Sequence, residues 1–196
     1  MKEFTSLPTP AFVVDEGLLE QNLEVLQEVA RASGAKILLA QKAFSMFYAY
    51  PMIARYLAGS TASGLYEARL GKEHFPGEVH VFSPAYREEE FTQLLQYADH
   101  FVFNSPKQLE KYARRAREAG KQVGLRVNPE CSPQEGHAIY DPCAPGSRLG
   151  TTRAQWDAAV AAHPELPALL DGLHFHTLCE QDADALAVTL AAVEKK

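Results

Sequence analysis

Short apolar segments recur at a regular spacing along this chain, and their rhythm constrains the fold more than any other feature. We expect β-strands at residues 36–40, 59–62, 79–83, 101–104, 122–127 and 172–176. The first five start about every 20–22 residues, the length of a strand plus the crossover helix that a parallel sheet needs. The sequence therefore predicts an α/β fold in which strands and helices alternate.

Helix start and stop signals lie between the expected strands. Ser105 and Gln108 form a capping-box pattern with Pro106 at the first helical position, and Gly120 closes that helix. Thr152 and Gln155 repeat the capping-box pattern. We also expect a helix before the first strand and another after the sixth, at residues 17–32 and 183–196.

The number of strands indicates which part of an α/β fold is present. A closed (β/α)8 TIM-like barrel has eight strands and typically about 250 residues. Six strands in 196 residues fit an incomplete amino-terminal portion of such a barrel, and we assign residues 1–196 to that portion.

Composition excludes several classes of partner. The net charge is −6 and the one basic cluster is at residues 114–117, which argues against nucleic acid and anionic membranes and is compatible with a cationic substrate. The amino-terminus lacks the pattern of a secretory signal, so we expect a cytoplasmic protein. Three cysteines without CxxC spacing, Cys131, Cys143 and Cys179, support neither a disulfide framework nor a structural zinc site.

Lys42 follows the first apolar strand directly. Alternation along that strand places Lys42 on the face of Leu38 and Ala40, with Ile37, Leu39 and Gln41 on the other. A lysine at the carboxyl end of a barrel strand is either a side chain whose stem packs while its ammonium reaches water, or a nucleophile.

Two histidines end the sixth strand. His174 and His176 are expected on the same face, so both could point into the barrel. A hydrogen-bonded core histidine is one interpretation of His174, and zinc shared with Cys179 and Glu180 is a minor alternative, although we expect no metal.

Residues 128–150 form an unusually long segment that is rich in Pro, Gly and Cys. A long irregular segment after a barrel strand is usually functional. Its prolines would hold Asp141 and Arg148 over the barrel mouth, where the carboxylate of Asp141 suits a cationic substrate. A dimer contact or a lid are alternatives.

Four stretches have the character of family motifs: 7–15 (LPTPAFVVD), 39–44 (LAQKAF), 140–150 (YDPCAPGSRLG) and 172–180 (GLHFHTLCE). Together they resemble the fold-type III pyridoxal phosphate (PLP) decarboxylases, the alanine-racemase-like group that includes ornithine and diaminopimelate decarboxylases. Nearly the whole chain is covered, and within the group the similarity is to the carboxynorspermidine decarboxylases. Many relatives have Gly-Ser after the second histidine of the last stretch, whereas this chain has Leu178 and Cys179.

The resemblance implies roles for single residues. Lys42 would form the Schiff base with PLP, the ring of His176 would stack on the cofactor, and Arg126 would lie near it. A salt bridge from Arg126 to Glu67 is a compatible alternative. Ser63, after the second strand, is a further candidate for the cofactor pocket.

The resemblance also implies an activity, the decarboxylation of carboxynorspermidine and carboxyspermidine to norspermidine and spermidine. The family's enzymes are homodimers with a further β-domain and a glycine-rich phosphate site, so we expect the 196 residues alone to be inactive. Two alternatives stay open: a single-domain PLP-binding protein with the same barrel, and an α/β scaffold domain without a cofactor.

Overall fold

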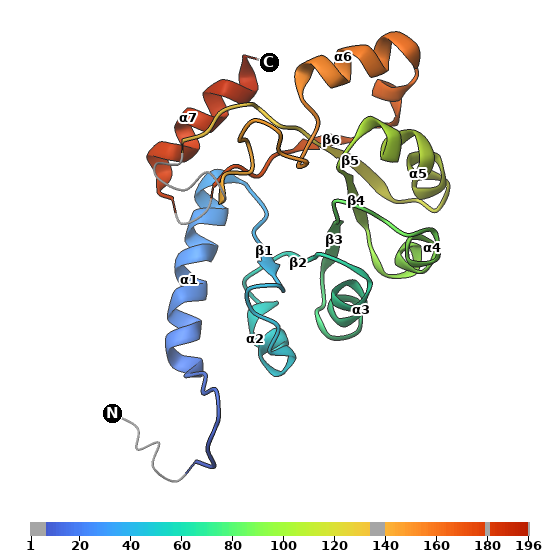
Figure 1. Cartoon of the computed structure of the whole chain (residues 1–196). Coiled ribbons are helices and arrows are strands. Elements are labelled where there is room, and N and C mark those ends of the chain that lie inside the picture. Colours follow the sequence, from blue (N-terminus) through green and yellow to red (C-terminus); the bar gives the residue numbers. More distant parts are fainter. Residues whose placement is uncertain (1–6, 134–139, 179–180, 196) are drawn as a thin grey trace.

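The computed structural model describes residues 7–133, 140–178 and 181–195. Six strands form one parallel sheet in sequence order. Seven α-helices lie before, between and after them (Figure 1). The strands are β1 (Leu38–Ala40), β2 (Gly59–Ala62), β3 (Glu78–Phe82), β4 (His100–Phe103), β5 (Gln122–Arg126) and β6 (Gly172–His174). The helices are α1 (Glu16–Ser33), α2 (Tyr50–Ile53), α3 (Leu65–His74), α4 (Glu88–Tyr97), α5 (Pro106–Glu118), α6 (Arg153–Ala162) and α7 (Ala183–Glu194).

This architecture confirms the expected α/β fold with a curved portion of a TIM-like barrel. Helices α2 to α6 lie along one side of the curved sheet, as Figure 1 shows. The expected strand bounds are wrong by one or two residues at most ends. The first strand begins at Leu38 and the sixth ends at His174, so His176 lies beyond the strand rather than within it.

Alternation along the strands separates a helix-facing side from a barrel-facing side. Val79, Val81, Phe101 and Phe103 are fully buried against the helices. Phe91 of α4 lies at the centre of that core, with its ring 4.3 Å from the ring of Tyr112 and 5.2 Å from that of Phe101. A second cluster joins α1 to α2 through residues that include Leu23, Tyr50, Ile53 and Phe75.

Helix ends follow the expected caps with one difference. The capping box of Thr152 and Gln155 is complete. The hydroxyl of Ser105 accepts from the Gln108 N–H at 3.4 Å, but the Gln108 side chain accepts from the Asn104 N–H at 2.8 Å instead of returning to Ser105. The second capping box is therefore half formed, and its glutamine ties α5 to the end of β4.

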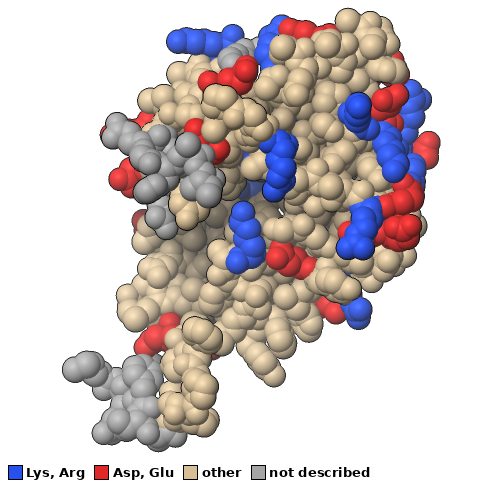
Figure 2. All heavy atoms as spheres, viewed as in Figure 1, with Lys and Arg blue, Asp and Glu red and all other residues tan. Residues whose placement is uncertain are grey.

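Charged side chains of both signs alternate on the surface over α4 and α5, at the right of Figure 2. Glu88 pairs there with both Lys111 and Arg115, and Arg114 lies 4.0 Å from Glu165. Exposed pairs of this kind contribute about 0–1 kcal/mol each, so they shape the surface more than they stabilise it. No helix in the described part of the chain is long and apolar enough to cross a membrane.

Candidate active site at the carboxyl ends of the strands

The candidate residues gather at one edge of the sheet. Lys42 lies in the turn after β1, Arg126 is the last residue of β5, and His174 is the last of β6, with His176 two residues further on. The carboxyl ends of parallel strands meet at the same edge, which is where barrel enzymes carry their chemistry. The fold therefore brings together residues that are more than a hundred positions apart.

The turn that carries Lys42 is fixed by its neighbour. Gln41 is 2% exposed, and its side-chain amide donates to the carbonyl of Thr61 at 3.2 Å and to that of Glu67 at 2.9 Å. The hydroxyl of Tyr50 donates to the Gln41 carbonyl oxygen at 3.1 Å. Gln41 thus lies on the helix-facing side, as expected, and the lysine next to it is exposed.

Arg126 is 5% exposed. Its Nη2 donates to the carbonyl of His176 at 3.1 Å, and its guanidinium carbon lies 4.8 Å from the centre of the Phe82 ring. Burial lowers the pKa of Arg126, and the charge of Arg148 lowers it further, whereas Cys143 acts in the opposite direction.

Glu67 does not form the expected alternative salt bridge with Arg126. Its Oε2 accepts from the N–H of Ser63 at 2.7 Å. Among the ion pairs of the described residues, none joins Arg126 to a carboxylate. A buried guanidinium therefore lies at this edge without a neutralising charge from those residues.

Both histidines respond to this positive environment. Burial lowers the pKa of His174 to about 4, and the charges of Arg126, His176 and Lys42 add to the effect. Burial, Arg126 and Lys42 lower the pKa of His176. The His174 imidazole is thus neutral at pH 7, and the shared influence of Lys42 and Arg126 on both histidines indicates that the four side chains form one electrostatic group.

Phe82 adds an aromatic surface to this group. The His174 ring stacks on the Phe82 ring with the centres 5.5 Å apart and the planes at 17°. Cys179 and Glu180, the other ligands of the minor zinc alternative, lie outside the described residues.

The segment after β5 returns to the sheet at Thr151. The Thr151 N–H donates to the carbonyl of Arg126 at 2.8 Å, and the Asn128 N–H donates to the carbonyl of Thr151 at 2.8 Å. Residues 134–139 of this segment lie outside the described residues. In the described part, Asp141 Oδ1 accepts from the Cys143 N–H at 2.8 Å, and the Arg148 side chain is exposed.

Asn104 holds that segment to the end of β4. Its side-chain amide donates to the carbonyl of Arg148 at 2.9 Å and accepts from the Gly150 N–H at 2.8 Å. The residue is 8% exposed. Asn104 was expected to end the strand, but β4 ends at Phe103 and the partners of Asn104 lie 44 and 46 residues further along the chain.

Ser63 lies apart from the other candidates. It is exposed and lines a hollow at the ends of β2 and β3 with Tyr66, Glu67, Ser83 and Tyr86. The lining of that hollow does not include Lys42, Arg126 or His176. The structure thus brings Lys42, Arg126 and the two histidines together and places Ser63 in a separate hollow.

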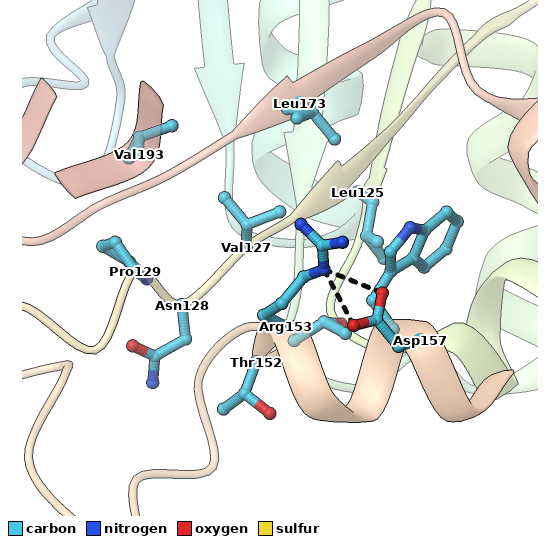
Figure 3. Close-up of a pocket in the computed structure, with 11 residues that line it drawn as sticks. Leu125, Val127, Asn128, Pro129, Thr152, Arg153, Asp157, Leu173 and Val193 are labelled. Atoms are coloured by element: carbon cyan, nitrogen blue, oxygen red, sulfur yellow. Dashed lines mark hydrogen bonds and ion pairs between the residues drawn. The ribbon is translucent and has the colours of Figure 1, made fainter. Parts of the chain in front are cut away.

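Another hollow lies on the helix-facing side of β5 and β6 (Figure 3). Its walls are mainly apolar and include Leu125, Leu173 and Trp156. Its charged pair is satisfied internally, because Arg153 Nε donates to both carboxylate oxygens of Asp157 at 2.7 and 2.9 Å. This hollow has the character of a packing surface and lacks a free nucleophile.

Known proteins with similar sequences are decarboxylases. The chain is 40% identical over 191 residues to the carboxyaminopropylagmatine decarboxylase of Synechocystis, covering 97% of this chain and 48% of that protein. It is 38% identical over 195 residues to the carboxynorspermidine/carboxyspermidine decarboxylase of Campylobacter jejuni, covering 98% of this chain and 48% of that protein. The chain thus spans about half the length of the curated relatives it matches.

The fold gives the same relationship. The crystal structure of carboxynorspermidine decarboxylase from Campylobacter jejuni complexed with norspermidine superimposes with a TM-score of 0.82 at 37% identity, over 97% of this chain and 47% of that one. These similarities confirm the expected resemblance. Residues 14–195 match the family described as the alanine racemase N-terminal domain, and the chain belongs to that family.

Proposed function

We propose that this chain is the PLP-binding portion of an enzyme that decarboxylates carboxynorspermidine and carboxyspermidine to norspermidine and spermidine. Members of the family use PLP, and the similar proteins are decarboxylases. One observation carries the proposal: a primary amine, Lys42, lies at the same edge of the sheet as a buried arginine and two histidines whose pKa values are lowered by burial and by both cations. That donor set suits an anionic aldehyde.

The residues fit the cofactor chemically. PLP carries an aldehyde, which a lysine amine can bind covalently, and a phosphate, which stabilises a nearby positive charge. When bound, PLP supplies the electron sink that makes loss of CO₂ possible. Arg126 lacks a carboxylate partner among the described residues, so the site has positive charge available for an anion.

We assign roles to the surrounding side chains on the same basis. His176 would place its neutral ring against the cofactor, and Arg126 would orient that histidine through its bond to the His176 carbonyl. His174 would hold the aromatic ring of Phe82 in place by stacking on it. We retain Ser63 as a weaker cofactor-binding candidate, because its N–H is already engaged by Glu67.

Asp141 and Arg148 are the proposed substrate contacts. Asp141 carries the negative charge that an ammonium group of a polyamine needs, and Asn104 holds the segment that contains Arg148. The charge of Arg148 acts on Arg126, which supports a position near the cofactor residues.

The substrate is tested by CO₂ release. Carboxynorspermidine, carboxyspermidine and carboxyaminopropylagmatine are compared, because similar proteins are named for each of them. We expect the first two to be preferred. We propose that activity and a homodimer require further polypeptide, since the relatives are about twice as long, and that the 196 residues alone release no CO₂. CO₂ release by the 196 residues would contradict that division.

Cofactor retention on dialysis tests the site itself. We expect His176→Ala to lose PLP more readily than His174→Ala, because His176 is the proposed stacking residue. His163→Ala, which changes a partly exposed histidine beside Glu110 and Glu165, serves as the matched control. Equal loss of PLP from the two site variants would refute the assignment. A chain as long as the relatives could bind PLP at Lys42 and still turn over none of the three substrates. That result would favour the single-domain PLP-binding alternative.

A further inference from the structure

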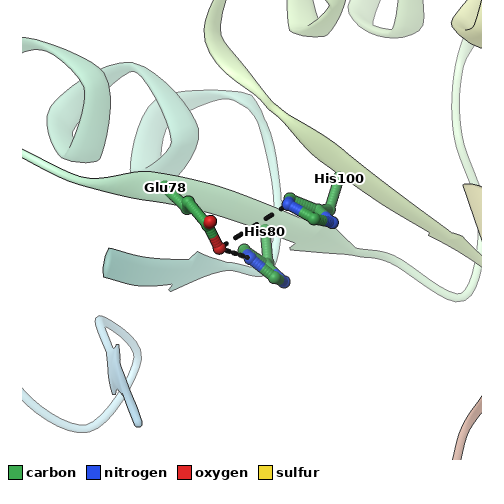
Figure 4. A group of neighbouring side chains, drawn as sticks. All are labelled: Glu78, His80 and His100. Atoms are coloured by element: carbon green, nitrogen blue, oxygen red, sulfur yellow. Dashed lines mark hydrogen bonds and ion pairs between the residues drawn. The ribbon is translucent and has the colours of Figure 1, made fainter. Parts of the chain in front are cut away.

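A second group of polar side chains lies at the opposite end of the strands from Lys42. Glu78 begins β3, and His80 follows two residues later on the same, barrel-facing side. His100 begins β4 and is the register partner of His80. Figure 4 shows the two imidazoles side by side with the carboxylate of Glu78 turned toward them.

The possible metal-ligating atoms of the three residues lie close together. Glu78 Oε2 lies 3.0 Å from His80 Nε2 and 3.6 Å from His100 Nε2. The donor atoms of all three residues lie within 4.8 Å of one another. In a tetrahedral zinc site with bonds of about 2.0–2.1 Å, neighbouring ligand atoms are roughly 3.3 Å apart. Both carboxylate-to-imidazole separations are already close to that value.

The protonation states also suit a cation. The side chains of Lys36 and His80 lower the pKa of Glu78 to about 2 by hydrogen bonding, so its carboxylate is ionised. Burial lowers the pKa of His100, and the charge of His80 lowers it further. The imidazole rings stack with their centres 3.8 Å apart and their planes at 13°, an arrangement in which two imidazolium charges would repel.

We propose that Glu78, His80 and His100 bind one divalent transition-metal ion of the zinc type at the amino-terminal end of β3 and β4. Two imidazoles and a carboxylate are a donor set that zinc uses in proteins, with water as a fourth ligand. The site is independent of the proposed PLP chemistry, because it lies at the other end of the strands.

Binding requires the two rings to leave their parallel stack. Nε2 of His80 must also exchange the proton that it shares with Glu78 for the metal, with the ring keeping its proton on Nδ1, and both Nε2 lone pairs must then turn toward a single ion. A hollow beside the rings, lined by residues that include Gln122, Gly124 and His174, gives them room to turn. Lys36 donates to the other oxygen of Glu78, Oε1, so Oε2 remains the oxygen that faces the imidazoles.

The probe is Co²⁺ added to the chelator-treated 196-residue chain, followed by displacement with Zn²⁺. We expect one saturable Co²⁺ per chain, with visible absorption bands of a low-symmetry site that Zn²⁺ abolishes. The His80→Ala, His100→Ala double variant should bind more than about tenfold more weakly. Glu78→Gln, which keeps the size of the side chain, should also weaken binding and guards against a folding defect in the double variant.

Two further variants locate the ion. His163→Ala is the control for a partly exposed histidine near carboxylates, and a His174→Ala, His176→Ala double variant tests the competing pair at the other end of the strands. Both should keep the affinity of the parent chain. The proposal is overturned if the parent shows no saturable binding, if the His80, His100 variant binds as tightly as the parent, or if the His174, His176 variant loses the ion. X-ray absorption of the zinc-bound chain should show nitrogen and oxygen ligands, and a sulfur ligand would contradict the site.

Discussion

Asn104→Ala tests how the segment that carries Asp141 and Arg148 is held in place. The substitution removes the donor to the Arg148 carbonyl and the acceptor of the Gly150 N–H, whose bonds measure 2.9 and 2.8 Å. The backbone of residue 104 still accepts from the Thr151 hydroxyl at 3.2 Å. The change therefore cuts the side-chain link to the loop while leaving the strand intact.

The expected cost follows from those two bonds. A hydrogen bond contributes about 0.5–1.5 kcal/mol net, and a polar group left without a partner costs about 1–3 kcal/mol when water cannot replace it. Gly150 is half-buried and the Arg148 side chain is exposed, so water replaces part of the loss. We expect the free energy of loop opening to fall by about 1–3 kcal/mol, which is roughly a 5- to 150-fold rise in the open population.

Native-state hydrogen exchange measures that population directly. The amides of Gly150 and Thr151 should exchange faster by that factor, whereas buried amides of α5, such as that of Ala113, should be unchanged. Ser147→Ala is the matched control, because its hydroxyl accepts from the Leu149 N–H within the same loop, at 3.2 Å. Unchanged exchange at Gly150 and Thr151, or an equal effect of Ser147→Ala, would refute the anchoring role.

Two further predictions concern the core and the site histidine. Phe91→Ala should lower the free energy of unfolding by about 3–5 kcal/mol, because a fully buried ring is removed from the aromatic core; a loss under about 1 kcal/mol in urea unfolding would contradict this. His174 should titrate near pH 4 by NMR, and a midpoint at or above its ordinary 6.5 would show that burial and the nearby charges do not act as described. Because the pKa of His174 is lower in the folded than in the unfolded state, the free energy of unfolding is not reduced by this group above about pH 6.5. As the pH falls from there toward 4, the free energy of unfolding drops by at most about 3 kcal/mol. His174→Gln should remove that pH-dependent drop.

The fold was largely predictable because its signals are local. Val79 and Val81 alternate with Glu78 and His80 along β3, and the same period recurs in β4. The sixth strand was predicted too long because its end depends on its neighbour. Arg126, the last residue of β5, is the register partner of His174, and beyond it the Arg126 side chain, not a backbone ladder, binds the carbonyl of His176.

The candidate site was predictable only where position within a strand determines it. Lys42 follows from its place at a strand end, whereas Arg126 was expected near the cofactor only from the resemblance to the PLP decarboxylases. The roles of Gln41 and Asn104 depend on partners 20 to 46 residues away in sequence, which no local pattern reveals. The Glu78, His80 and His100 group was missed for the same reason, although the Glu-x-His spacing on an expected strand edge was a partial signal.

The identity of the modified lysine tests the central claim most directly. The 196-residue chain is incubated with PLP, reduced with borohydride to fix any Schiff base as a secondary amine, digested, and analysed by mass spectrometry. Lys42→Ala is the matched variant, and Lys36, at the other end of the first strand, is the internal comparison. The account predicts that the pyridoxyl group is found on Lys42 and that the Lys42→Ala chain is unmodified. Modification spread over surface lysines, or modification of Lys36 in preference to Lys42, would contradict it.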